Sequence, residues 1–99
     1  MYYDVKTAKY IEEYKIHLEF EDGNSGVVDI SIFIGKGQLS KSLKNPEYFK
    51  TFSVNPDLGT ICWENGYDIA PETLYFLVTG KHNFKSGLPD YIFESGTKL

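Results

Sequence analysis

The clearest pattern in the chain is an alternation of apolar and polar residues with a period of two. Its apolar members are Tyr14, Ile16, Leu18 and Phe20. Successive side chains of a β-strand point to opposite faces, so this pattern predicts a strand with one buried and one exposed face. A weaker pattern predicts a strand over residues 5–11, and Val28 and Ile30 mark a third. The Asp22-Gly23 step supplies the positive φ of a hairpin turn, so the first third is predicted to be an antiparallel meander.

Two short helices are predicted in the rest of the chain. Leu39 and Leu43 fit one apolar helical stripe, and Asn45 followed by Pro46 is typical of a helix start. Pro71 opens the second helix. Its predicted buried stripe comprises Leu74, Leu77 and Val78. Gly80 is placed to end that helix in the left-handed conformation.

A second hairpin is predicted between the two helices. Residues 52–55 and 60–63 form its strands, around a turn from Pro56 to Gly59. Two antiparallel sheet segments and two short helices predict a small α+β domain, with the helices packed on one face of a mainly antiparallel sheet.

We assign residues 1–80 to this single domain and residues 81–99 to a C-terminal extension. The extension is rich in turn-forming residues, and its apolar cluster is Tyr91-Ile92-Phe93. Three alternatives are open for it: an extra strand, a contact with a neighbouring chain, or a partly disordered segment.

Several segments, in a fixed order and spacing, resemble a known family. They are Phe20-Glu21-Asp22-Gly23, Val28-Asp29-Ile30, Leu43-Lys44-Asn45-Pro46-Glu47-Tyr48-Phe49 and the stretch from Gly59 to Tyr75, which reads GTICWENGYDIAPETLY. Together they resemble the small bacterial family catalogued as domain of unknown function 2442, from about Val5 to Gly80. The stretch from residue 59 to 75 is the most specific part. The same glycines, prolines and apolar residues also fit turns, helix starts and a core.

The resemblance implies a fold more firmly than a function. Members are generally uncharacterised; some carry a helix-turn-helix DNA-binding domain, and many are encoded beside another small protein, as in a toxin–antitoxin-like pair. We therefore expect a non-enzymatic protein-interaction or regulatory module that binds a protein partner or itself. The alternatives are a module that acts in DNA regulation with a separate DNA-binding partner, and a small ligand-binding protein or enzyme.

Two groups of charged residues are candidates for binding. Lys36, Lys41 and Lys44 belong to a segment with four lysines and one acid, which suits an acidic partner, a phosphate backbone or a plain solvated helix face. Glu64 and Asp68 flank a turn and suit cation binding or acid–base chemistry. The simpler interpretation gives these acids turn and cap roles, with Asp68 capping the second helix.

Histidine and cysteine add little chemistry. Cys62 and His17 could form a nucleophile pair across strands, although burial of Cys62 as a small apolar filler is simpler. The other histidine is His82. The spacing of these three residues is not that of a metal site. We therefore expect no metal, no cofactor and no catalytic residue.

Composition and charge narrow the function further. With 41% hydrophobic and 16% aromatic residues the chain is not of the disordered class. Ten basic and fourteen acidic side chains give a net charge of −4, which disfavours direct nucleic-acid binding. A single cysteine forms no intrachain disulfide, and neither a signal-peptide pattern nor a membrane-spanning apolar run is present. These features predict a cytoplasmic protein.

Overall fold

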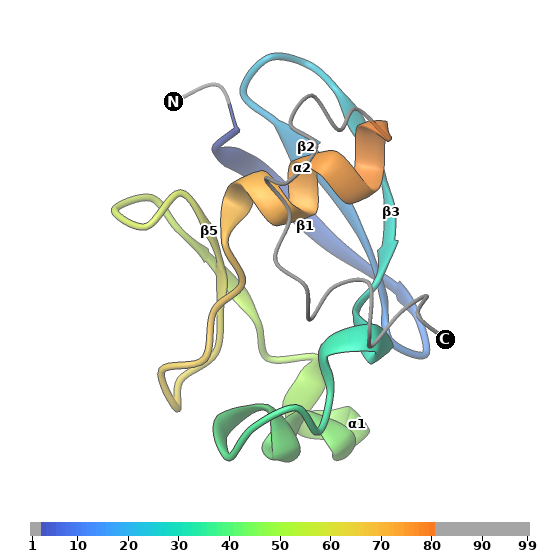
Figure 1. Cartoon of the computed structure of the whole chain (residues 1–99), viewed down its shortest axis with the longest axis vertical. Coiled ribbons are helices and arrows are strands. Elements are labelled where there is room, and N and C mark those ends of the chain that lie inside the picture. The colour runs from blue at the N-terminus through green and yellow to red at the C-terminus, as the bar shows by residue number, and fades with distance from the viewer. Residues whose placement is uncertain (1–2, 81–99) are drawn as a thin grey trace.

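The computed structural model describes residues 3–80, and the alternatives set out for residues 81–99 fall outside the described residues. The helices and strands, in chain order, are β1 (Val5–Glu12), β2 (Lys15–Phe20), β3 (Ser25–Asp29), the 3₁₀-helices η1 (Ile30–Phe33) and η2 (Leu39–Lys44), α1 (Pro46–Phe49), β4 (Ser53–Asn55), β5 (Thr60–Cys62) and α2 (Pro71–Thr79). The strands form a three-stranded antiparallel sheet, β1-β2-β3, and a two-stranded hairpin, β4-β5 (Figure 1).

The meander follows the predicted alternation. Ile16 pairs with Tyr10 on β1 and with Val28 on β3, and this row faces the core. The neighbouring row, centred on His17, faces outward and ends at Val27, which is 52% exposed. One apolar face therefore fixes the register, because a slip by one residue would turn it toward solvent.

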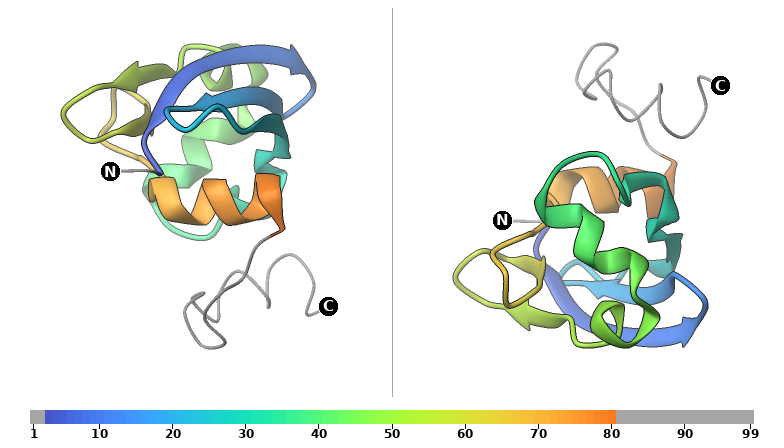
Figure 2. Two further views of the ribbon diagram at one scale, coloured as in Figure 1. Left: turned by 90° about the horizontal axis from the view of Figure 1, so that it is seen from above. Right: turned by 90° about the horizontal axis from the view of Figure 1, so that it is seen from below.

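Helix α2 covers the inner face of this sheet. Its Val78 lies so close to β3 that a Cβ on Gly26 would approach Val78 Cγ1 to 2.9 Å. Gly80 ends the helix with φ 71° and donates its N–H to the carbonyl of Phe76 at 2.7 Å, as predicted. Viewed from above, the sheet and α2 form two layers (Figure 2).

The predicted buried stripe of α2 is correct in part: Leu74 is fully buried, and Leu77 and Val78 pack against the core without being fully covered. The buried residues are Thr73, Leu74, Tyr75 and Phe76, whereas Leu77 and Val78 are half-buried. Tyr75 and Phe76 are buried because α2 is covered on a second side. The ring of Tyr3 lies 4.9 Å from that of Tyr75 and 5.5 Å from that of Phe76, so burial extends around the helix.

Helix α1 begins as predicted, with the Asn45 side chain accepting from the backbone N–H of Glu47 at 2.9 Å. Its Phe49 packs against Tyr14 on the inner side of the sheet, with ring centroids 5.0 Å apart. Both α-helices thus lie on one face, and the α+β prediction is confirmed. The predicted stripe of Leu39 and Leu43 is wrong in part: Leu43 is fully buried, but Leu39 is 46% exposed.

Candidate functional site

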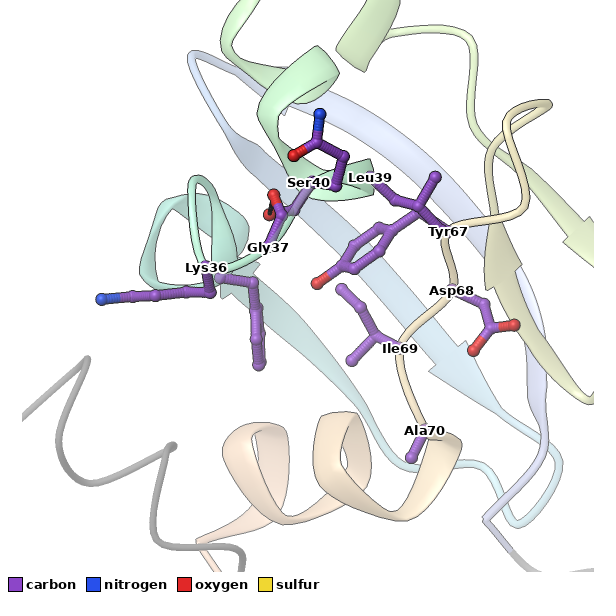
Figure 3. A pocket seen from close by; sticks show the side chains of 10 residues that line it. Lys36, Gly37, Leu39, Ser40, Tyr67, Asp68, Ile69 and Ala70 are labelled. Atoms are coloured by element: carbon purple, nitrogen blue, oxygen red, sulfur yellow. Dashed lines mark hydrogen bonds between the residues drawn. The ribbon is translucent and has the colours of Figure 1, made fainter.

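A pocket on the described residues lies between two segments that are far apart in the sequence. Residues 36–40 form one wall, and residues 67–70 form the other (Figure 3). Phe33 also lines the pocket, which encloses about 520 Å³. This volume falls within the roughly 300–1,000 Å³ that is usual for ligand sites. We call it the Lys36 pocket.

The first wall is held by Ser40. Its buried hydroxyl accepts from the backbone N–H of Gly35 at 3.1 Å and donates to the carbonyl of Gly37 at 3.3 Å. The side chain of Asn65 donates to the carbonyl of Leu39 at 3.0 Å and so joins the two walls. The loop is therefore fixed by polar contacts.

The second wall is anchored to the hairpin. Asp68 forms an isolated antiparallel bridge with Cys62, and the hydroxyl of Thr60 donates to the carbonyl of Ile69 at 2.6 Å. The ring of Tyr67 lies 5.7 Å from that of Trp63. Tyr67 extends its phenol toward the loop at Gly37, as Figure 3 shows. The interior of the pocket is thus mainly apolar, with one phenolic hydroxyl.

Residues 5–80 match the model of a family described as a protein of unknown function, DUF2442. The chain belongs to this family. The resemblance noted in the sequence is therefore confirmed. No curated protein and no solved structure matches the chain.

Both walls of the Lys36 pocket lie inside the part of the chain that matches DUF2442. The second wall also falls within the stretch from residue 59 to 75 that carries the most specific resemblance. The sequence marked Lys36 and Asp68 for separate reasons, but it gave no sign that their segments meet, nor that Phe33 and Tyr67 line a shared pocket.

The three candidate lysines lie on the first wall or in the 3₁₀-helix that continues from it. Lys36 lines the pocket, and Lys44 reaches back toward the same loop, its Cε 3.6 Å from where a Cβ on Gly35 would stand. Lys41 and Lys44 are three residues apart in a 3₁₀-helix, so they share one face. Within residues 3–80, none of these three lysines forms an ion pair, although Lys50 pairs with Glu47 at 3.7 Å.

The two candidate carboxylates do not converge on the pocket. Glu64 is exposed in the turn after Trp63 and does not line it. Asp68 lines the pocket, but its carboxylate points away from Tyr67 (Figure 3). The predicted capping role of Asp68 is also wrong, because the N-cap of α2 is Ala70, which makes no side-chain capping bond.

Cysteine and histidine are placed apart. Cys62 is half-buried on β5 of the hairpin, while His17 lies in the centre of the three-stranded sheet on its outer face. Thr60, two residues before Cys62 on β5, is buried, and its hydroxyl donates to the carbonyl of Ile69 inside the molecule. In the part of the chain that the structure describes, no three His, Cys, Asp or Glu side chains cluster to hold a metal.

One further polar cluster joins the β2–β3 turn to α2. The hydroxyl of Tyr75 donates to Asp22 Oδ2 at 2.6 Å, and Asn24 Nδ2 donates to Tyr75 Oη at 3.1 Å. The hydrogen bond to the Asp22 carboxylate, aided by burial, raises the pKa of the Tyr75 phenol. We call this cluster the turn contact, and its role is to attach α2 to the sheet.

Among residues 3–80, the structure contains no helix of the length and apolar character that crossing a bilayer requires.

Proposed function

We propose that this domain is a non-enzymatic module that binds a protein partner through the Lys36 pocket and its lysines. The observation that carries the proposal is the meeting of two features at one place. An open apolar pocket lies beside three lysines that have no ion-pair partner within the described residues. Leu39, 46% exposed, adds an apolar side chain to the rim.

These features favour a partner with apolar side chains next to carboxylates. Apolar contact supplies affinity, and charge complementarity supplies register and speed of association. Because Asp68 points outward and Glu64 does not line the pocket, the alternative of carboxylate chemistry at this site receives no support from the geometry. If the domain is regulatory, the chain and its partner form a toxin–antitoxin-like pair.

The test places a photo-crosslinking residue, p-benzoylphenylalanine, at Leu39 in one full-chain variant and at Val27 in another. Both positions are about half exposed, at 46% and 52%, but Val27 lies on the outer face of the sheet. In cells that naturally produce the chain, we expect the variant with the crosslinker at position 39 to crosslink to one protein. The variant with the crosslinker at position 27 should not. Equal crosslinking from both positions would argue against the pocket.

Affinity measurements with the purified crosslinked protein complete the test. We expect Lys41→Glu/Lys44→Glu to weaken binding by about tenfold at low salt, since each exposed charge pair contributes up to ~1 kcal/mol. The control is Lys9→Glu, an exposed lysine on the outer face of the sheet, which should leave affinity unchanged. Unchanged affinity in the double variant would contradict the proposal.

A further inference from the structure

The sequence contains a segment whose chemistry matches the Lys36 pocket. Residues 90–94 read Asp-Tyr-Ile-Phe-Glu, so three apolar residues stand between two carboxylates. The pocket offers the complementary arrangement: its interior is lined by Phe33, Tyr67 and Ile69, and Lys36 stands at its rim. The segment lies outside the described residues, and its sequence alone enters the argument.

The distance between the pocket and the end of α2 can be spanned by the chain between them. Helix α2 starts at Pro71, directly after the pocket residue Ala70, and ends at Thr79. At 1.5 Å per residue this helix is roughly 13 Å long. Ten residues join its end to the segment, and ten residues can span at most roughly 33–36 Å. The connection is therefore long enough for the segment to reach the pocket of its own chain.

Because the segment and the pocket belong to the same chain, even a weak contact between them is formed in most molecules. A short linker gives an effective concentration of about 1 mM. A contact with a dissociation constant of about 0.1 mM would then be formed in about 90% of molecules.

We propose that residues 90–94 bind in the Lys36 pocket of their own chain. Their apolar side chains enter the pocket, and their two carboxylates lie near Lys36, Lys41 and Lys44. The segment then competes with an external partner for the pocket and acts as a built-in inhibitor. The intramolecular contact does not depend on the proposed function. The competition with an external partner does depend on it.

Disulfide trapping in the full chain tests the contact. In a Cys62→Ser background, which removes the single native thiol, Leu39→Cys is combined with Ile92→Cys; the matched control combines Val27→Cys with Ile92→Cys. Under mild oxidation at micromolar concentration, we expect an intramolecular disulfide to form at least ten times faster from position 39. Lys41→Glu/Lys44→Glu should slow this reaction several-fold at low salt.

Three results would overturn the inference: equal rates from both positions, no disulfide from position 39, or disulfide-linked dimers alone. The last would mean that a second copy occupies the pocket. Circular dichroism of each variant checks that the fold is retained.

A second variant separates this inference from the proposed function. If the segment competes, Tyr91→Ser/Phe93→Ser should raise affinity for the crosslinked partner by about tenfold, because a 90% occupied pocket becomes free. Trapping without any partner would retain the contact and reject the proposed function. Partner binding at the pocket without trapping would retain the function and reject the inference.

Discussion

The turn contact and the Lys36 pocket use charged and polar groups in opposite ways. In the turn contact, Asp22 accepts from Tyr75 and Asn24, so the polar groups bind one another inside the molecule. At the pocket, Lys36 and its two neighbouring lysines make no ion pair within the described residues, and the apolar lining is open. Charge in this domain therefore supports the fold where it is matched internally, and it stays exposed to solvent where it has no ion-pair partner among residues 3–80.

The largest expected effect on stability comes from removing the side chain of Phe49. This ring packs against Trp63, which in turn contacts the pocket residue Tyr67. Phe49 is fully buried, packs against Trp63 with centroids 5.8 Å apart, and its carbonyl accepts from the Trp63 indole N–H at 2.9 Å. We expect Phe49→Ala to lower the free energy of unfolding by about 3–5 kcal/mol, which is much of the stability of so small a domain. Urea unfolding followed by circular dichroism measures this. Leu58→Ala, in an exposed turn, is the control and should cost about 0.5 kcal/mol or less.

The next effect concerns the contact between α2 and the sheet. Gly26→Ala should cost about 1–3 kcal/mol, because its Cβ would overlap Val78 Cγ1. Adding Val78→Ala should recover part of that loss, since it removes the overlapping methyl groups. Thermal unfolding of both single variants and the double variant tests this. Purely additive losses would show that the close approach does not limit packing.

A smaller effect sharpens the role of the turn contact. Tyr75→Phe should cost less than Gly26→Ala, because it removes the hydrogen bonds of one hydroxyl group and leaves the ring packing in place. Because the pKa of Tyr75 is raised in the folded state, its stabilisation is complete below the ordinary phenol pKa near 10 and is lost as pH rises through the folded value. The difference in unfolding free energy between wild type and Tyr75→Phe should therefore shrink above pH 10. A constant difference up to pH 12 would contradict this.

The smallest effect on stability belongs to the pocket lysines. Lys41→Glu/Lys44→Glu changes two exposed side chains that form no ion pair within residues 3–80. We expect a change in unfolding free energy within about 0.5 kcal/mol. Calorimetric unfolding at low salt checks this. A large loss would show that these lysines support the fold, which would remove the contrast between the two regions.

The sequence predicted the elements whose pattern is local. The alternation around Ile16 and the Asn45-Pro46 helix start produce the strand and the helix expected from them. The predicted burial of Leu39 is wrong because a stripe with a spacing of four residues assumes an α-helix. In the 3₁₀-helix η2, residues three apart share a face, and the buried pair is Ser40 and Leu43.

The pocket could not be predicted because its walls meet only in the folded chain. The two walls are separated by more than twenty-five residues, and no periodicity reports a contact over that separation. Lys36 and Asp68 carried a local signal, charge, and both line the pocket. Phe33 and Tyr67 looked like ordinary apolar residues, because the sequence does not say which aromatic side chains border an open space.

The position of Trp63 makes its intrinsic fluorescence a probe of the Lys36 pocket. The sequence has one tryptophan, which is only 2% exposed, so its emission reports on a single dry environment. Its ring lies 5.7 Å from that of Tyr67, which lines the pocket. A molecule that settles against Tyr67 should therefore change the tryptophan fluorescence, and occupancy can be followed in solution without any attached dye.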